Sequence, residues 1–177
     1  DIILDNLIAE GKAEQMIVAM MDGNSQDFAA ELITDGIPLV ENRYRTLTTA
    51  DGRALAGLSM GGIQTLNISI MHPGLFRYIG VFSSGWFKNP QPFMANSSGE
   101  QYYAKLKERP DYYNKQFREF FITMGGKEDI AYENCKAMRE RFDEMGIRYT
   151  YLETPGGHTW PVWRESLYHF VQRIFKR

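Results

Sequence analysis

The sequence predicts an α/β protein, in which a mainly parallel sheet has helices packed on both of its faces. Apolar runs typical of strands alternate with runs of helical spacing along the 177 residues, and parallel strands require such crossovers. One helical run, residues 60–72, is apolar nearly all round, as expected of a helix buried against a sheet. A glycine-rich turn joins it to the strand before it. The length predicts one domain over residues 1–177.

The first third of the chain contains two expected helices and two expected strands. Residues 2–10 form an amphipathic helical pattern, and residues 28–42 carry apolar side chains at helical spacing. Residues 15–21 form a continuous apolar run that ends at a turn-forming Asp-Gly-Asn, which predicts a buried strand. A second apolar run at 54–58 predicts the strand that leads into the glycine-rich turn.

The middle of the chain adds a helix, a strand and a long insertion. The helix over 60–72 is expected to stop at Pro73, because proline cannot continue a helix. The apolar residues 78–83 predict the next strand. Residues 85–118 are aromatic and polar, and we expect them to form an insertion that lines the site, with one helix near 98–108.

The last third continues the alternation of strands and helices. Residues 119–124 and 148–153 are strand-like runs. Residues 130–145 follow a helical pattern that ends at Gly146, and glycine commonly terminates helices. Residues 161–176 predict a final helix. The strands of such a sheet are mainly parallel, so the loops that follow them meet at one edge.

Residues 57–61, Gly-Leu-Ser-Met-Gly, match the nucleophile elbow of the α/β-hydrolase fold. In this motif Ser59 sits on a sharp turn between a strand and a helix, with its hydroxyl held out from the backbone. The turn crowds the positions two before and two after the serine, so both favour glycine. The backbone N–H of Met60 lies in the first helical turn without an intrahelical partner and is free to bind a developing oxyanion. The alternative is a tight strand–helix connection in which the serine is incidental.

A serine nucleophile needs a base, and the chain has three histidines. His72 closes the helix after the elbow and His169 lies inside the last expected helix, so both read as ordinary helix residues. His158 lies in a glycine-rich loop between the last strand and the last helix. That loop is at the carboxyl end of the sheet, where the sites of open α/β sheets lie. We therefore predict that His158 is the base; an exposed loop histidine is the alternative.

The base needs a carboxylate that orients it, and in this fold the chain order is serine, acid, histidine. Three acidic residues that follow the strand over 119–124 are candidates. We favour Asp129, keep Glu128 as the second candidate and place Glu133 third. Asp129 is also suited to cap the helix expected from Ile130, and this structural role is compatible with the catalytic one.

Composition and charge argue against several classes of protein. The net charge is −2 and no basic run is present, which disfavours a nucleic-acid partner. No apolar stretch is long enough to span a membrane, and we expect no membrane partner. The single cysteine, Cys135, excludes an internal disulfide and a cysteine-based metal cluster. No residue spacing suggests a metal site, so we expect neither a metal nor a cofactor.

Four segments resemble a known family of esterases. Residues 56–62 (AGLSMGG) resemble the nucleophile motif of the esterase D-like group. Residues 124–129 (MGGKED) and 156–163 (GGHTWPVW) resemble its acid and histidine loops. Residues 17–24 (IVAMMDGN) resemble the segment before the elbow in bacterial feruloyl and acetyl-xylan esterases of carbohydrate esterase family 1. The resemblance covers essentially the whole chain and is loosest in the insertion.

The resemblance implies a serine carboxylesterase that removes feruloyl or acetyl groups from plant cell-wall xylan, or its oligosaccharides, by acyl-enzyme chemistry without a metal. It also implies a secreted or periplasmic location. In that family Trp163, beside the histidine, would be placed to line the acyl pocket. Trp160, Trp86 and Phe87 are further candidates for substrate binding. The alternative for Trp160 and Trp163 is packing of the last helix on the sheet.

The chain departs from the family on its amino-terminal side. Family members have additional strands there, including one whose loop supplies the second oxyanion donor, and no such segment precedes Ser59 in this sequence. The resemblance therefore implies the carboxyl-terminal part of a larger catalytic domain. The missing strand would lie between residues 15–21 and 54–58. We expect a gap there, filled by a separate amino-terminal fragment or by a second copy of the chain, or closed by direct pairing of the two flanking strands.

Other functions are compatible with the same motifs. S-formylglutathione hydrolases and mycolyl transferases share the fold and the triad, but no feature of the sequence specifically favours them. A different class is a non-catalytic remnant of the fold that binds carbohydrate or acts as a scaffold, because part of the oxyanion hole is absent. The intact set of Ser59, Asp129 and His158 argues against this alternative.

Overall fold

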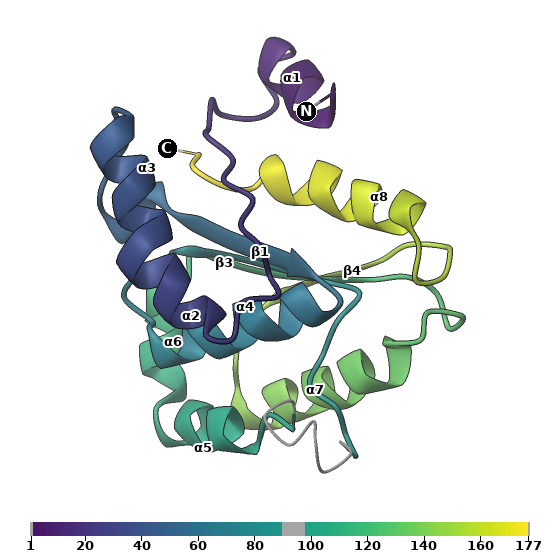
Figure 1. The fold of residues 1–177 in the computed structure, drawn as a ribbon. Helices are drawn as coiled ribbons and strands as arrows, with labels where there is room; N and C mark the ends of the chain where they lie inside the picture. The colour runs from purple at the N-terminus through teal and green to yellow at the C-terminus, as the bar shows by residue number, and fades with distance from the viewer. Residues whose placement is uncertain (1, 90–97, 177) are drawn as a thin grey trace.

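A parallel sheet lies at the centre of the computed structural model, which describes residues 2–89 and 98–176. In this part of the chain four strands pair in the order β1–β2–β3–β4 (Figure 1). The strands are β1 (Ala54–Leu58), β2 (Tyr78–Phe82), β3 (Glu119–Met124) and β4 (Thr150–Glu153). Helices connect successive strands, so the predicted α/β fold with a parallel sheet is confirmed.

Helices cover both faces of the sheet (Figure 1). One face carries α4 (Met60–Met71), α5 (Glu100–Glu108), α6 (Pro110–Gln116) and α7 (Tyr132–Met145). The other carries α1 (Ile2–Ala9) and α8 (Trp160–Val171). An irregular helical run beside α4 consists of α2 (Phe28–Glu31), a π-helical turn η1 (Leu32–Gly36) and α3 (Ile37–Arg43), and a 3₁₀ turn η2 (Ala50–Gly52) precedes β1. Within the described ranges no helix is long and apolar enough to cross a membrane.

A separate apolar core fills the space on each side of the sheet. The core under α4, α5, α6 and α7 includes the fully buried Leu66, Ile79 and Ile122. The core under α1 and α8 includes Phe121 and Phe170, whose rings stack 6.1 Å apart. Because β2 and β3 are covered on both faces, their side chains are apolar at nearly every position, as expected of central parallel strands.

The register of the strands aligns their carboxyl ends. Leu58 of β1 pairs with Phe82 of β2. Thr123 of β3 pairs with Phe82 on one side and with Leu152 of β4 on the other. The loops that follow these residues leave the sheet at one edge, where open α/β sheets bind their ligands. The residues predicted as nucleophile, acid and base all lie in these loops.

The prediction of a strand over residues 15–21 is wrong. The segment makes no strand pairing, and the side chains of Ile17, Val18 and Met20 are 50%, 54% and 92% exposed. A strand needs a neighbour that takes up its backbone N–H and C=O groups. No neighbour among the described residues does so, which is why an apolar run of the right length does not become a strand.

β1 forms one edge of the sheet. Within residues 2–89 and 98–176 its only strand partner is β2, and no backbone hydrogen bond links it to residues 15–21. Of the three ways in which the expected gap could be filled or closed, direct pairing of the two flanking segments is therefore wrong.

Two other elements differ from the prediction. The insertion over 85–118 contains two helices, α5 and α6, where one was expected, and its residues 90–97 lie outside the described part of the chain. The helix predicted from Ile130 begins at Tyr132 and is preceded by Ala131 at the cap position. Asp129 is therefore not the cap residue, although its carboxylate accepts from the N–H of Ala131 just before the helix.

Candidate active site

Ser59 lies on the tight turn between β1 and α4. Its backbone has φ 53° and ψ −122°, a sparsely populated conformation that costs on the order of 1–3 kcal/mol. The Ser59 N–H donates to the carbonyl of Phe82 at 2.9 Å. The Ser59 carbonyl accepts from the Gly62 N–H at 3.0 Å and from the Ser84 hydroxyl at 2.6 Å. Neighbouring groups thus hold the strained turn on both sides of the serine.

Two glycines of the elbow serve the turn in different ways. A Cβ on Gly57 would lie 2.2 Å from the carbonyl oxygen of Gly61, so no side chain fits there. A Cβ on Gly61 would meet no atom of the described residues within 4 Å. The expected crowding is therefore confirmed for a side chain at Gly57. It is wrong for a side chain at Gly61, which takes part in the crowding only through its backbone carbonyl.

Three loops bring a serine, a histidine and an aspartate into one hydrogen-bonded row. The Nε2 of His158, in the loop after β4, lies 2.9 Å from the Oγ of Ser59. Its Nδ1 lies 2.8 Å from the Oδ1 of Asp129, in the loop after β3. An ionised carboxylate only accepts hydrogen bonds, so Nδ1 carries the proton and Nε2 is free to accept the serine proton. This is the arrangement of a nucleophile, a general base and the acid that orients it.

The surroundings of Asp129 keep its carboxyl ionised, although the residue is only 3% exposed. Burial acts to raise its pKa, but the Ala131 N–H, the Ser83 hydroxyl and His158 together outweigh burial and hold the pKa below its ordinary value. The bond from the Ala131 N–H to Oδ1 is 2.9 Å long. The carboxylate is therefore charged at neutral pH and able to stabilise a protonated imidazole.

The other acidic candidates lie apart from the imidazole. Glu128 and Glu133 are exposed. Within the described residues Asp129 is the one carboxylate that hydrogen-bonds His158. The geometry therefore selects Asp129 among the three acids that the sequence left open.

The other two histidines lie on helices, as expected. His72 ends α4. His169, on α8, lies 3.0 Å from a carboxylate oxygen of Glu165 one turn earlier. Neither residue is bonded to Ser59, whose contact with an imidazole comes from His158.

The backbone N–H of Met60 is at the first position of α4, where a helix leaves its N–H groups without intrahelical partners. It is adjacent to the nucleophile and suited to an oxyanion. The turn that follows residues 15–21 is tied to the same helix, because the Gln64 amide donates to the carbonyl of Gly23 at 2.9 Å. No second oxyanion donor can be assigned from the described residues.

An apolar cavity of about 80 Å³ opens beside the serine and the histidine. Its walls include Phe87, Ile130 and Ala131, and Asn134 adds one amide. Phe87 was expected at the site from its place after a strand end. Ile130 and Ala131, just before α7, and Asn134 in its first turn were not predicted as cavity residues. The signal that points to them is their position shortly after the acid in the sequence.

Trp163 lies against the base, as the resemblance implied. Its ring centre is 5.0 Å from that of His158, with the ring planes at 88°. Trp160 packs edge to face on Trp163 at 5.1 Å and is 63% exposed. Neither indole is part of the cavity wall, so their placement fits support of the histidine better than direct lining of an acyl pocket.

Trp86 was predicted to bind substrate, and the structure corrects this prediction. The residue is 1% exposed, its ring stacks on Tyr102 at 5.4 Å, and it lies 4.7 Å from the ring of Tyr103. Its indole N–H donates to the Oδ1 of Asn67 at 2.8 Å. An aromatic residue just past a strand end can turn either to the site or to the core, and here the two tyrosines of α5 provide a core for it.

Replacing Trp86 with alanine is expected to lower the free energy of unfolding by about 3–5 kcal/mol, because it opens a large cavity and leaves the Asn67 amide without its partner. Trp160→Ala is the matched control, and a change of no more than about 0.5 kcal/mol is expected there, since this indole is mostly exposed. Urea unfolding followed by circular dichroism measures both. Equal losses in the two variants would contradict the assignment of Trp86 to the core.

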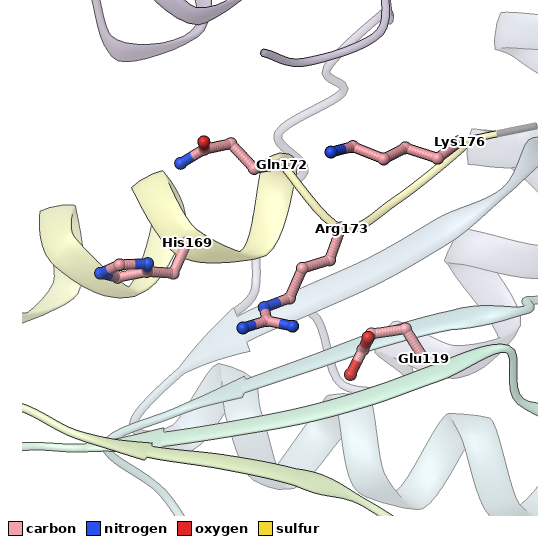
Figure 2. Close-up of a pocket in the computed structure, with 5 residues that line it drawn as sticks. All are labelled: Glu119, His169, Gln172, Arg173 and Lys176. Atoms are coloured by element: carbon pink, nitrogen blue, oxygen red, sulfur yellow. The ribbon is translucent and has the colours of Figure 1, made fainter.

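A larger hollow of about 440 Å³ lies at the opposite end of the sheet (Figure 2). It is lined by Glu119, His169, Gln172, Arg173 and Lys176. Glu119 begins β3, whereas the acid loop follows the end of that strand. The hollow is therefore remote from the serine. In the described part of the chain, no group of three or more His, Cys, Asp or Glu side chains is arranged to hold a metal ion.

Comparison with known proteins identifies both a family and a set of similar folds. The model of the Esterase family matches residues 19–174. An endo-1,4-beta-xylanase/feruloyl esterase of Xylanibacter ruminicola is 30% identical over 189 aligned residues, which cover 99% of this chain and 23% of that protein. An esterase of Mycobacterium tuberculosis is 26% identical over 174 residues, which cover 78% of this chain and 38% of that protein. The chain thus spans well under half the length of these curated relatives.

Solved structures of similar fold include esterases of two kinds. A mutant feruloyl esterase module from Clostridium thermocellum, complexed with sinapinate, is 25% identical with a TM-score of 0.74, and the match covers 97% of this chain and 68% of that one. A ferulic acid esterase is 20% identical with a TM-score of 0.80, and the match covers 96% of this chain and 74% of that one. An S-formylglutathione hydrolase from Staphylococcus aureus is 17% identical with a TM-score of 0.68, and the match covers 85% of this chain and 61% of that one. The last two matches show similarity of fold alone.

Proposed function

Because the chain belongs to the Esterase family, we propose that it carries the catalytic centre of a serine carboxylesterase in which Ser59 is the nucleophile, His158 the general base and Asp129 the orienting acid. The observation that carries this proposal is the hydrogen-bonded row of the three side chains. His158 Nε2 lies 2.9 Å from Ser59 Oγ, on the strained strand–helix turn, and His158 Nδ1 lies 2.8 Å from Asp129 Oδ1. The family supports ester hydrolysis over other acyl transfers.

The proposed reaction begins with transfer of the acyl group to Ser59. His158 Nε2 takes the hydroxyl proton while Oγ attacks the ester carbonyl, and the negative charge that forms on the carbonyl oxygen is bound by the Met60 N–H. The carboxylate of Asp129 stabilises the imidazolium through Nδ1–H. When the tetrahedral intermediate collapses, the bond to the alcohol breaks and Nε2 returns the proton to the leaving oxygen.

The second half of the reaction releases the acid. A water molecule gives a proton to His158 Nε2 and attacks the acyl carbonyl, and collapse of the second intermediate returns the proton to Ser59 Oγ. The free carboxylic acid and the regenerated serine are the products. The same three side chains thus serve both halves, and no other group has to donate or accept a proton.

Phenolic esters of the feruloyl class are the substrates that we propose. A relative named as a xylanase/feruloyl esterase and a solved feruloyl esterase module complexed with sinapinate support this class. The apolar cavity beside the serine is suited to an aromatic acyl group, and the exposed side chain of Ile130 extends its apolar wall outward. Feruloylated xylan is the finer proposal for the natural substrate, and a location outside the cytoplasm, secreted or periplasmic, goes with a polysaccharide substrate.

Hydrolysis of methyl ferulate and of 4-nitrophenyl acetate by the purified chain tests this function, with Ser59→Ala as the control. The expected result is turnover that depends on Ser59 and a higher kcat/KM for methyl ferulate. A preference for the acetate ester would instead favour the acetyl branch. Turnover on neither substrate would contradict the proposal that this chain alone is a competent feruloyl esterase.

We also propose that a further strand completes the sheet beside β1. The support is the edge of β1 that has no strand partner within residues 2–89 and 98–176, together with the exposed apolar side chains of Ile17, Val18 and Met20, since an open apolar edge is otherwise an aggregation liability. A separate amino-terminal fragment or a second copy of the chain would supply it. Light scattering of the purified chain, compared with hydrogen exchange of the β1 amides, distinguishes a self-associated sheet from an open one.

The alternative function is a non-catalytic remnant that binds carbohydrate or acts as a scaffold. Two observations favour it, namely the open edge of β1 and the single assigned oxyanion donor. A fluorophosphonate probe separates the two hypotheses, because it labels a serine only when a base activates it. Labelling at Ser59 supports the esterase, and an unlabelled chain supports the remnant.

A further inference from the structure

Ser83 follows β2 and lies between the elbow and the acid. It is fully buried, and its backbone has φ 44°, a left-handed conformation that is unusual for a residue with a side chain. Its N–H donates to the carbonyl of Thr123 at 2.9 Å, which fixes the backbone at the carboxyl end of the sheet. Glycine would adopt this conformation more easily, so the presence of serine here calls for a role of the hydroxyl.

The two oxygens of the Asp129 carboxylate have different partners. Oδ1 accepts from the Ala131 N–H at 2.9 Å and faces His158 Nδ1 at 2.8 Å. Oδ2 is buried, and among the described residues it has no hydrogen bond of ordinary geometry. The Ser83 Oγ is also buried and, among the described residues, also has no hydrogen bond of ordinary geometry.

These two unpaired groups lie in neighbouring loops, because Ser83 follows β2 and its N–H is bonded to Thr123 near the end of β3, the strand that Asp129 follows. In agreement with this placement, the Ser83 hydroxyl is one of the groups that lower the pKa of Asp129 against the opposing effect of burial. On another side of Oδ2 lies Gly125, where a Cβ would come within 3.0 Å of that oxygen, so no side-chain donor approaches from there. A buried carboxylate oxygen without a donor is costly, and Ser83 is the hydroxyl placed to serve it.

We propose that the Ser83 hydroxyl donates to Asp129 Oδ2 and that Ser83 is a positioning residue of the active site, an inference that rests on the proposed esterase function. With Oδ1 and Oδ2 both held, the carboxylate cannot rotate about its Cβ–Cγ bond, and Oδ1 stays in line with the imidazole Nδ1. The next residue, Ser84, holds the nucleophile in a similar way, because its hydroxyl donates to the Ser59 carbonyl at 2.6 Å. Two consecutive serines would thus fix both ends of the triad.

Removal of this donor has a defined effect on protonation. The titratable groups that act on Asp129 are the His158 imidazole from the loop after β4 and the Cys135 thiol from α7. Burial raises the pKa of Cys135 to about 12, so the thiol stays neutral. The coupled Asp129–His158 pair therefore determines the acid side of the pH profile. A carboxylate that loses a donor attracts a proton more strongly, so the pair takes up its proton at higher pH.

The test compares Ser83→Ala and Ser83→Gly with the unaltered chain and with Ser69→Ala. Ser69 is a matched control, because it is another buried serine, and its hydroxyl donates to the carbonyl of Leu66 within α4. We expect both Ser83 variants to lose roughly tenfold in kcat on methyl ferulate with little change in KM. We expect the acid limb of their pH–rate profiles to move up by about half a pH unit.

A second readout does not depend on ester turnover. The Nδ1–H proton of His158, which lies on Asp129 Oδ1, can be followed by NMR, and its chemical shift should change in both Ser83 variants and stay unchanged in Ser69→Ala. If the unaltered chain hydrolyses no ester, the proposed function fails while this resonance still tests the hydrogen bond. Ser83→Gly removes the hydroxyl and also relieves the strained backbone, so an effect seen in both variants does not come from strain. An unshifted pH–rate profile and an unshifted Nδ1–H resonance in Ser83→Gly would overturn the proposal.

Discussion

Replacement of Ser59 by alanine is expected to lower kcat for ester hydrolysis by a factor of about 10⁴–10⁶, because loss of the nucleophile removes the acyl-enzyme route altogether. Alanine keeps a Cβ at φ 53° and therefore does not change the strain of the elbow. The fold should be retained. Steady-state hydrolysis of methyl ferulate measures the effect, and circular dichroism verifies the fold.

The control for this variant is again Ser69→Ala, which removes a buried hydroxyl from the same helix region without touching the triad. Labelling by a fluorophosphonate should disappear in Ser59→Ala and persist in Ser69→Ala. Turnover that survives loss of Ser59 would mean that another group attacks the ester, and the assignment of the nucleophile would then be wrong.

Replacement of Asp129 by asparagine is expected to lower kcat by a factor of about 10⁴. Asparagine keeps the shape of the side chain, and its amide oxygen can still accept from the Ala131 N–H. It has no negative charge, and if its NH₂ group turns to His158 it imposes the wrong tautomer on the imidazole. The loss should therefore appear in kcat, with the thermal unfolding temperature changed much less than by a core mutation.

Glu128→Gln is the matched control for the acid, because it makes the same chemical change one residue earlier on an exposed side chain. We expect its kcat to stay within about twofold, as for most surface substitutions. A large loss in Glu128→Gln with a small loss in Asp129→Asn would show that the loop rearranges during catalysis and that the second candidate is the acid.

The nucleophile, the base and the loop that holds the acid could be identified from the sequence because their requirements act over a few residues. The elbow needs Gly57, since its Cβ would meet a backbone oxygen at 2.2 Å. The order of strands and helices then brings the loops that contain Asp129 and His158 to the same sheet edge as Ser59. What remained open was the choice among three acids, because their side-chain directions depend on how the loop before α7 folds.

The aromatic residues were harder to assign from the sequence, because their environment depends on residues far away in the chain. Trp86 and Phe87 are neighbours after the same strand, yet one is 1% exposed in the core and the other lines the cavity. Which of two adjacent side chains faces the site depends on the partners that approach from elsewhere, here the tyrosines of α5. The role of Ser83 was likewise invisible, because nothing near it in the sequence marks it as a neighbour of Asp129.

The sequence by itself determined the parallel α/β class, the turn that presents Ser59 and the loops from which a base and an acid could come. These features follow from residue periodicity, backbone dihedral preferences and chain order, which are local properties. Only the tertiary structure decided that Asp129 is the acid in contact with His158, that Trp86 belongs to the core and that residues 15–21 are not a strand. Each of these depends on whether a distant group supplies a hydrogen bond or a packing surface, and a linear pattern does not contain that information.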